Sequence, residues 1–326
     1  MLCYISLSER RLACRQNISI YRGWYGVLKN KMIRTIAILV VGIISISFAA
    51  IFIRFCSDVP AIMIATYRMC VASIILLMFS GIKGISFKAV CRRDLLLSLA
   101  GGVFLGLHFI FWTTSLKYTS VASSVVIVTT NPIFVGIFSW FFLREKQHAE
   151  IIAGTALCLL GSIVIAAGDS GLHALVLLDK RALAGDVLAL AGAVMGSAYL
   201  LTGSRVRERL DILTYITIVF TASALFLVTT SLVIGVSFTG YRPSSYMYMV
   251  LLAVIPQLMG HTSINWALEH LRAGMIAISI LGESIGATIL AYLFFDETVS
   301  IFQIAGMALI FAAIIIASRK GKKTRG

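Results

Sequence analysis

Charged residues are scarce in this sequence. Only 13% of its 326 residues are Asp, Glu, Lys or Arg, whereas soluble domains average roughly 25%. Hydrophobic residues make up 59% of the chain, and the mean hydropathy is +0.96. One soluble core cannot hide that much apolar surface, because cores stop growing at about 250 to 300 residues. The shortage of charge therefore excludes an ordinary soluble protein and predicts that lipid is the solvent.

Signatures of nucleotide, zinc and redox chemistry are missing as well. No GxxxxGK[ST] loop is present that would cradle the phosphates of ATP, and no HExxH pair is present that would bind a catalytic zinc ion. The six cysteines include no CxxC pair and no spacing suited to zinc. We therefore expect no metal, no cofactor and no enzymatic activity.

The net charge of +14 does not indicate a nucleic-acid partner. The 28 Lys and Arg residues lie in short segments between apolar runs rather than on one continuous basic face. This placement is typical of a polytopic membrane protein. The partners that we expect are the lipid bilayer and a small-molecule solute, and the sequence leaves a homodimer open.

Ten segments are long and apolar enough to cross a bilayer, whose hydrocarbon core of about 30 Å takes roughly 20 helical residues. The connections between them are mostly short, and none is long enough for a soluble domain. The sequence thus predicts an all-α membrane protein with ten transmembrane helices. The predicted spans cover residues 33–53, 60–79, 95–115, 120–143, 149–168, 183–202, 212–235, 246–267, 273–295 and 301–318.

Both ends of the chain are basic. Residues 1–31 contain six Lys and Arg but no long apolar run, so they form neither a signal peptide nor a spanning helix. Met32 opens the first apolar segment. Translation therefore begins either at Met1, which gives a basic cytoplasmic tail, or at Met32, which makes residues 1–31 an artefact of the assigned start. Residues 319–326 form a second basic cytoplasmic tail.

The cations also predict an orientation. If the N-terminus is cytoplasmic, 22 of the 28 Lys and Arg residues lie on the inner side and five in the outer loops, while Arg68 lies inside the second span. Cytoplasmic loops carry the excess of Lys and Arg. We therefore expect a multi-pass protein of a prokaryotic inner membrane with both termini in the cytoplasm.

The two halves of the chain resemble each other. A shift of 152 residues places NPIFVGIFSWFFLREKQHAEIIAGTAL, which begins at Asn131, over ESIGATILAYLFFDETVSIFQIAGMAL, which begins at Glu283. The repeats cover residues 32–168 and 183–318, with five helices each. Because five is an odd number, the second repeat must cross the membrane in the opposite sense. Inverted repeats of this kind are typical of transporters.

Three segments carry a resemblance to a known family. They are ATYRMCVASIILL in the second span, TNPIFVGIFSWFFLREK at the end of the fourth and AGMALIFAAIII in the tenth. With ten helices in two halves, the chain resembles the drug/metabolite transporter superfamily, specifically its EamA-type members. The resemblance implies a helical bundle around a central cavity that opens to each side in turn. The second half departs from the first, since Glu283 and Ser284 stand where the first half has Asn131 and Pro132.

Glu283 is the main candidate for a functional residue. It lies about ten residues into the ninth span, which at 1.5 Å per residue is about 15 Å deep, at the midplane. Ionisable groups at that depth cost roughly 2.5 to 3.5 kcal/mol and usually face a cavity or a partner. Glu283 could bind and release a proton or pair with a cationic group of the substrate. The structural alternative is a permanent salt bridge or hydrogen bond between helices.

The eighth span carries four polar residues at intervals of four: Gln257, His261, Asn265 and Glu269. This spacing gives a polar ridge that drifts about 40° per step along a helix. Since lipid would not tolerate the ridge, we expect it to line the transport pathway. Hydrogen bonding between helices, with Glu269 at the cytoplasmic interface, is the structural alternative.

Further candidates lie in the first repeat. His108 and Trp112 share a helical face and could stack on an organic solute, although a satisfied core histidine fits as well. Arg68 could pair with Glu283, bind a carboxylate of the substrate or simply pack. Asn131 and Pro132 could supply a free carbonyl or, more simply, a kink.

Glu145 and Glu297 close their helices near opposite membrane faces. We interpret them, with Pro132, as structural landmarks. The pattern as a whole predicts a secondary transporter of a small organic metabolite, such as an amino acid or a related amphiphile. Alternating access is its expected mechanism, with proton coupling through Glu283 as a hypothesis. The other readings are a scaffold or receptor without transport and, less favoured, an intramembrane enzyme.

Overall fold

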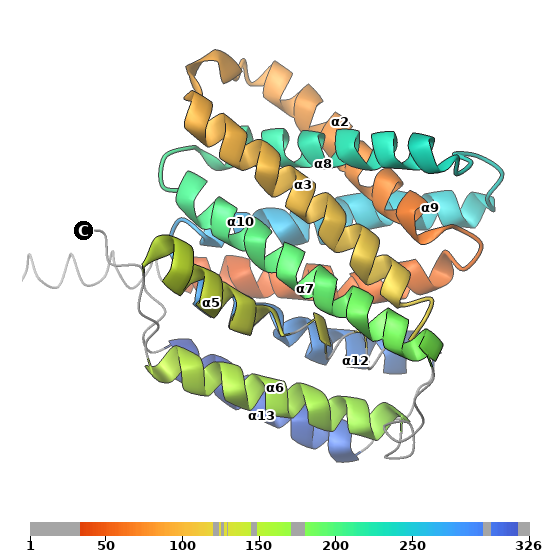
Figure 1. The fold of residues 1–326 in the computed structure, drawn as a ribbon, viewed down its shortest axis with the longest axis vertical. Coiled ribbons are helices and arrows are strands. Elements are labelled where there is room, and N and C mark those ends of the chain that lie inside the picture. Colours follow the sequence, from red (N-terminus) through yellow and green to blue (C-terminus); the bar gives the residue numbers. More distant parts are fainter. Residues whose placement is uncertain are drawn as a thin grey trace, which may run out of the picture. The chain divides into compact units, whose positions relative to one another are not determined.

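A computed structural model of the chain describes residues 33–119, 124, 127–128, 130–144, 149–170, 180–295 and 301–318 (Figure 1). The chain divides into two units at Val40 and Val41. Within the first unit, the described residues begin a helix. Everything discussed below lies in the second unit, Val41–Gly326.

Every regular element within these ranges is a helix. The first helix covers Ile33–Phe55. The others are α2 (Ala61–Ile82), η1 (Phe87–Ala89), α3 (Arg92–Ser115), α5 (Asn131–Leu143), α6 (Ala149–Ser170), α7 (Lys180–Val206), α8 (Ile212–Ile234), α9 (Pro243–Leu252), η3 (Ala253–His261), α10 (Thr262–Ala267), α11 (Ala273–Ile280), α12 (Gly282–Phe295) and α13 (Ile301–Ser318).

The described helices confirm the predicted fold class. Seven are long and apolar enough to span a membrane, and three shorter apolar helices, Asn131–Phe142, Ala149–Gly161 and Ile304–Ile316, lie in the fourth, fifth and tenth predicted spans. Each of the ten predicted spans therefore overlaps an apolar helix. In the fourth span, most of residues 120–129 lie outside the described ranges.

The eighth span is not a uniform helix. α9 leads into the π-helical segment η3, which contains Pro256, and α10 completes the span. Proline lacks an N–H group and its ring clashes with the carbonyl four residues earlier. A wider turn relieves that clash, and such π-turns are frequent at functional sites. Gln257 and His261 both lie in this segment.

The fourth and ninth spans break at corresponding positions. α5 begins at Asn131 after a turn at Thr130, and α12 begins at Gly282 after a turn at Leu281. The shift of 152 residues superposes these starts within one residue. Only the first break contains a proline, Pro132, which lies in the first turn of α5, where proline is tolerated. Symmetry of the two breaks thus does not depend on proline in both halves.

Helix contacts repeat between the halves. The fifth and tenth spans, α6 and α13, lie side by side, as do the second and seventh, α2 and α8 (Figure 1). α7 packs on α3 and α5, and the first helix makes the equivalent contacts with the eighth and ninth spans. A Cβ atom on Gly260 would lie 3.3 Å from Gly42 O, and one on Gly286 would lie 2.6 Å from Ser47 Cβ. These paired contacts are what two related five-helix repeats require.

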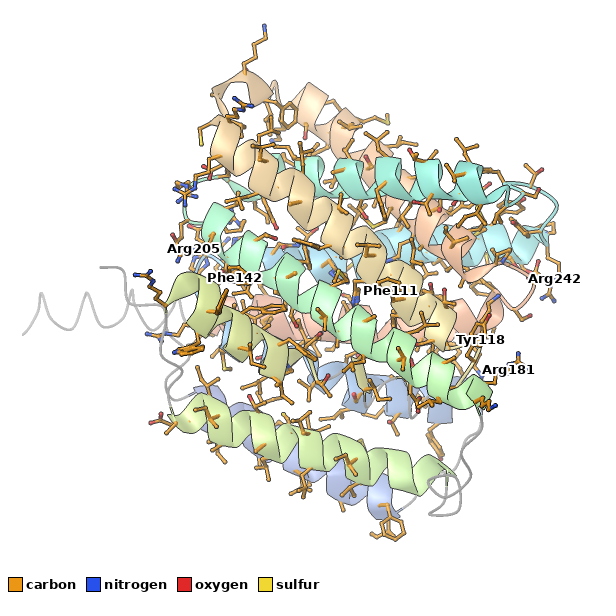
Figure 2. The ribbon with its side chains drawn as sticks, in the orientation of Figure 1. Phe111, Tyr118, Phe142, Arg181, Arg205 and Arg242 are labelled. Atoms are coloured by element: carbon orange, nitrogen blue, oxygen red, sulfur yellow. The ribbon has the colours of Figure 1, made fainter. Side chains whose placement is uncertain are left out.

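The bundle exposes apolar side chains along its length and cations at its ends. Phe141, Leu225 and Phe311 are each more than 60% exposed, as expected of a surface that faces lipid rather than water. Figure 2 shows Arg181 and Arg242 near one end of the bundle and Arg205 near the other. This distribution agrees with the predicted division of the loops, while the assignment of the cytoplasmic end stays a prediction.

Candidate functional site

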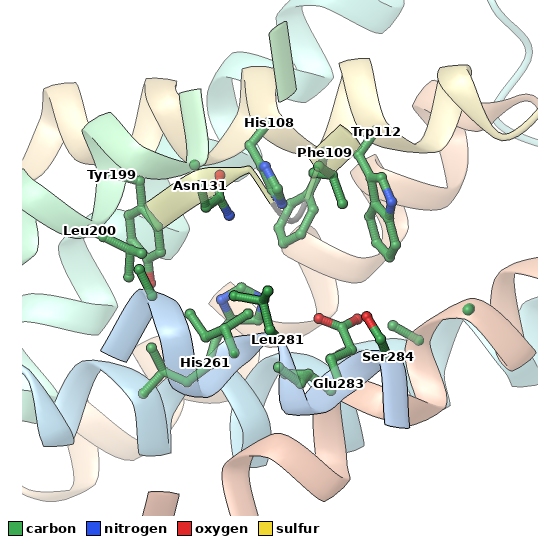
Figure 3. A pocket seen from close by; sticks show the side chains of 18 of the residues that line it. His108, Phe109, Trp112, Asn131, Tyr199, Leu200, His261, Leu281, Glu283 and Ser284 are labelled. Carbon is green, nitrogen blue, oxygen red and sulfur yellow. The ribbon is translucent and has the colours of Figure 1, made fainter. Parts of the chain in front are cut away.

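A cavity lies among the spans at the centre of the second unit (Figure 3). Its volume is about 80 Å³, measured as the space open to the centre of a water molecule, and one water needs roughly 10 to 15 Å³ on that measure. It therefore has room for several waters or a small organic group. The polar and aromatic residues that line it are Arg68, His108, Phe109, Trp112, Asn131, Tyr199, His261, Glu283 and Ser284.

The cavity brings together most of the residues that the sequence singled out. Arg68, His108, Trp112, Asn131, His261 and Glu283 line it, and they come from α2, α3, α5, η3 and α12. Gln257 and Asn265 do not line it, but each makes a hydrogen bond to a residue that does. Glu269 lies further along the eighth span. The roles of all these residues in transport stay predictions.

Arg68 is a nearly buried cation, with 2% of its surface exposed. Its Nε donates a hydrogen bond to Gln257 Oε1 over 2.8 Å, and its guanidinium carbon lies 4.1 Å from the centre of the Phe109 ring. Within the described residues, Arg68 forms no ion pair with Glu283. The counter-ion role that the sequence left open is therefore not realised in this conformation.

The two histidines differ in their partners. His108 Nδ1 lies 2.8 Å from Gly192 O, so this nitrogen must carry a proton and donate it, which leaves Nε2 as the acceptor of a neutral ring. His108 also stacks on Trp112, with centroids 6.2 Å apart and planes at 17°. His261 packs edge-on against Phe109 at 5.5 Å. Its Nδ1 has no hydrogen-bond partner within the described part of the chain.

Asn131 lies against the neighbouring helix α7. Ser197 Oγ lies 3.1 Å from the Asn131 backbone carbonyl and 3.3 Å from its Oδ1, while its one proton has a shorter acceptor in Ala193 O at 2.7 Å. The close approach of α7 depends on Gly196, because a Cβ atom there would lie 2.8 Å from His108 Nδ1. The start of α5 is thus packed against a hydroxyl of α7.

Glu283 enters the cavity from the start of α12. Figure 3 shows its carboxylate turned toward Phe109 and Trp112, with Ser284 beside it. The side chain is half-buried, and its carboxylate makes no hydrogen bond or ion pair to any described residue. Ser47 Oγ lies 3.3 Å from Glu283 O, but its one proton has a shorter acceptor in Ile43 O at 2.8 Å. The carboxylate oxygens of Glu283 are therefore open to a ligand.

The letters GESIG, Gly282–Gly286, match the G-x-S-x-G pattern of the hydrolase nucleophile elbow. That motif requires a sharp turn from a strand into a helix, with a base on the serine. Here Ser284 lies in the first turn of α12, which follows another helix, α11. Its Oγ has no hydrogen-bond partner among the described residues, so no histidine within them activates it. The match consequently gives no support to a catalytic serine.

Unpartnered buried polar atoms gather at the cavity. Trp112 Nε1, His261 Nδ1 and Ser284 Oγ belong to residues that line it, and Gln257 Nε2 belongs to the partner of Arg68; none has a hydrogen bond within the described ranges. More than nine in ten buried polar groups in proteins are satisfied. Four further unpartnered atoms belong to Tyr215, Ser223, Thr262 and Asn265, which do not line the cavity. Those on the cavity wall are places where water or a ligand can complete the hydrogen bonding.

Three of the polar and aromatic residues that line the cavity were not predicted: Phe109, Tyr199 and Ser284. Tyr199 Oη receives a hydrogen bond from Asn265 Nδ2. No signal in the sequence pointed to Tyr199, which lies three residues from the end of the predicted span 183–202, where tyrosine is common at a membrane interface. Phe109 and Ser284 each directly follow a predicted residue in the sequence, but a lone apolar or hydroxyl residue in a span carries no distinguishing pattern.

The Glu269 end of the polar ridge behaves differently from its centre. Glu269 Oε2 accepts from Arg207 Nη2 at 2.7 Å, and Arg207 Nε donates to Asn265 O at 3.1 Å. Arg207, just beyond α7, is buried, and this burial lowers its pKa while Glu269 opposes the shift. Glu269 thus joins two spans at one end of the bundle and does not reach the cavity.

The remaining predicted landmarks can be placed only in part. Glu145, Glu297 and both basic tails lie outside the described residues. Within the described ranges, no group of three or more His, Cys, Asp or Glu residues is arranged to hold a metal ion.

Comparisons with known proteins give the chain its family. The model of the EamA-like transporter family matches twice, over residues 33–167 and 183–319. The uncharacterized transporter YetK of Bacillus subtilis is 24% identical over 81% of this chain and 80% of its own. Solute carrier family 35 member G1 of Mus musculus is 24% identical over 86% of this chain and 75% of its own.

A solved crystal structure of a protein shares the fold. Its TM-score is 0.73 at 16% identity, over 89% of this chain and 99% of that one. The duplicated family match agrees with the ten apolar helices and their repeated contacts. The protein is a membrane protein that belongs to the EamA-like transporter family.

Proposed function

We propose that this chain is a secondary transporter that carries a small organic metabolite through the central cavity by alternating access. We place it in a prokaryotic plasma membrane with both termini in the cytoplasm. Energy would come from the gradient of the solute or of a coupled ion, because the sequence contains no loop for ATP.

The proposed class of substrate rests on one observation. The cavity holds a cation, Arg68, and a carboxylate, Glu283, that do not neutralise each other. Charges at membrane depth are costly and persist where they meet each other or a ligand. A zwitterion such as an amino acid offers a carboxylate to Arg68 and an ammonium group to Glu283. Its apolar side chain would contact the aromatic rings of Phe109 and Tyr199.

The repeated contacts support alternating access. Because the first helix meets the eighth and ninth spans as α7 meets α3 and α5, the two repeats can exchange conformations with little change in the contacts between them. Exchange of that kind opens a central site to each side in turn. The breaks at Asn131 and Gly282 give both repeats a flexing point beside the cavity.

Glu283 is the group that we assign to proton coupling. Its carboxylate has no protein partner among the described residues, so a proton and a cationic solute group compete for the same oxygens. Release of one would accompany binding of the other, which links the two gradients.

Reconstituted protein tests both statements. We expect wild-type proteoliposomes to accumulate an amino acid when a pH gradient is imposed. Glu283→Gln should lose this accumulation and also weaken solute exchange without a gradient, because the neutral amide imitates the protonated carboxyl, which cannot pair with the ammonium group. The matched control is Glu150→Gln, a half-buried carboxylate at the start of α6 outside the cavity, which should behave as wild type.

Two results would contradict the proposal. Unchanged pH-driven accumulation by Glu283→Gln would remove the proton-coupling role. A folded wild-type protein that neither moves nor is stabilised by any member of a broad metabolite panel at two pH values would favour a scaffold or receptor, because binding to the folded state raises its apparent stability.

A further inference from the structure

The guanidinium of Arg68 has an unusual environment. It is almost fully buried, yet no carboxylate within the described residues pairs with it. The ring of Phe109, 4.1 Å from its central carbon, supports the charge from one face. Nε is the only guanidinium nitrogen with a hydrogen bond to a described residue. The two terminal nitrogens therefore offer a fork of N–H donors to the cavity, in the arrangement that binds a carboxylate with two hydrogen bonds.

Gln257 supplies the single hydrogen bond to Arg68. Its side chain is 0% exposed, and its Oε1 accepts from Arg68 Nε over 2.8 Å. Since Nε–H can only donate, the amide must turn its oxygen toward Arg68, and Gln257 Nε2 is left without a partner. A buried N–H group without a hydrogen bond lowers the stability of the folded state. Gln257 is thus a poor contributor to stability, and its position is explained by what it does to Arg68.

The neutrality of Gln257 is the decisive property. A carboxylate at this place would also accept from Nε, but it would form an ion pair and satisfy the charge of Arg68 within the protein. An amide oxygen fixes the direction of the guanidinium and leaves its charge for a ligand. The π-helical segment around Pro256 carries this oxygen on the eighth span, opposite α2.

We propose that Gln257 is a positioning residue that orients Arg68 as the receptor for a carboxylate on the solute and thereby makes the carrier selective for solutes that bear one. The proposal rests on the transport function proposed above. It adds the residue that sets selectivity and the chemical group that is selected.

The test compares two probes that differ in the carboxylate. L-phenylalanine has it, and 2-phenylethylamine lacks it and keeps the ammonium group and the ring. Binding to purified protein is followed by thermal stabilisation, and transport by flux into proteoliposomes. We expect wild-type protein to prefer L-phenylalanine. Gln257→Glu should lower the affinity for L-phenylalanine by roughly 10- to 100-fold, the range of one hydrogen bond to a charged group, and should spare 2-phenylethylamine.

A second variant guards against misfolding of the first. Gln257→Met keeps the volume and removes the acceptor, so Arg68 loses its fixed direction and selectivity should fall, by less than in Gln257→Glu. Leu252→Met is the packing control, because Leu252 is equally buried on the same span. It should change the affinity for both probes in parallel or not at all.

Three results would contradict the role of Gln257 or the proposed class of solute. If both variants keep the wild-type ratio of affinities, Gln257 does not position Arg68 and the inference fails while transport stands. If the ratio falls in parallel with thermal stability in Leu252→Met as well, the role of Gln257 is structural. If folded wild-type protein binds neither probe, both the carboxylate site and the proposed class of solute are wrong.

Discussion

The ends of the bundle and its centre treat polar groups in opposite ways. At the ends, each of two carboxylates accepts three hydrogen bonds. Asp94 accepts from Arg209 at 2.6 to 3.0 Å. Asp58 accepts from Arg242 N, Arg242 Nη2 and Ser245 Oγ at 2.6 to 3.0 Å. Around the cavity, the polar atoms of Trp112 and Ser284 and the carboxylate of Glu283 lack partners among the described residues.

This difference distinguishes polar groups that stabilise the fold from polar groups that are available to a ligand. A buried polar group without a hydrogen bond costs free energy, and a chain gains stability by pairing it. The same chain pairs these charges at both ends, whereas the cavity holds a cation and a carboxylate that do not pair with each other, although buried hydroxyls without a described partner also lie elsewhere, at Tyr215 and Ser223. We infer that the ends hold the spans together and that the centre is left incomplete for a ligand.

The largest expected effect concerns the ion pair between Arg207 and Glu269. The side chain of Arg207 is 1% exposed and that of Glu269 is 34% exposed. Glu269→Ala leaves a buried cation without its carboxylate, which should lower the free energy of unfolding by about 2 kcal/mol after allowance for solvent at Glu269. Thermal unfolding in detergent measures it. Glu208→Ala, an exposed neighbour of Arg207, should have little effect; equal losses would contradict a structural role for the pair.

A smaller effect, limited to acid, is expected at Asp58. The backbone N–H of Arg242 and the hydroxyl of Ser245 hold the pKa of Asp58 well below its usual range. Since the folded state favours the ionised form, its contribution to stability is complete above the unfolded pKa of about 4 and is lost as the pH falls further. The melting temperature of wild-type protein should therefore fall more steeply between neutral pH and pH 3 than that of Asp58→Asn. Parallel curves would show that these contacts do not stabilise the fold.

The smallest effect should have the opposite sign. Ser284→Ala removes a buried hydroxyl that has no described partner. The free energy of unfolding should therefore stay the same or rise by up to about 1 kcal/mol, while solute flux decreases. Ser231→Ala is the matched control, because Ser231 Oγ shares a hydrogen bond of 3.0 Å with Thr66 Oγ1. It should destabilise the protein and leave transport unaffected. Destabilisation by Ser284→Ala would remove the distinction between centre and ends.

Much of the fold could be predicted because hydropathy is additive along the chain. Each helix needs about 20 apolar residues to cross the bilayer, and that count locates spans without any knowledge of their neighbours. The breaks were harder to predict. Pro256 lies within the irregular part of the eighth span, whereas the break at Leu281 has no proline to mark it in the sequence.

The candidate site was predictable only where a residue is costly in lipid. Glu283, Arg68 and the histidines stood out because ionisable groups at membrane depth are rare. Tyr199 and Phe109 did not, since an aromatic residue in a span is as compatible with lipid as with a cavity. Their position at the cavity is visible only when α3 and α7 are packed together.

The sequence by itself determined the solvent, the number and placement of the spans and the set of costly polar residues, because these depend on composition and on local periodicity. The tertiary structure decided which of those residues meet. In it, Glu269 is hydrogen-bonded to Arg207 and Gln257 to Arg68, while the carboxylate of Glu283 has no described partner. Pairing depends on distances between helices far apart in the chain, and local sequence does not encode those distances.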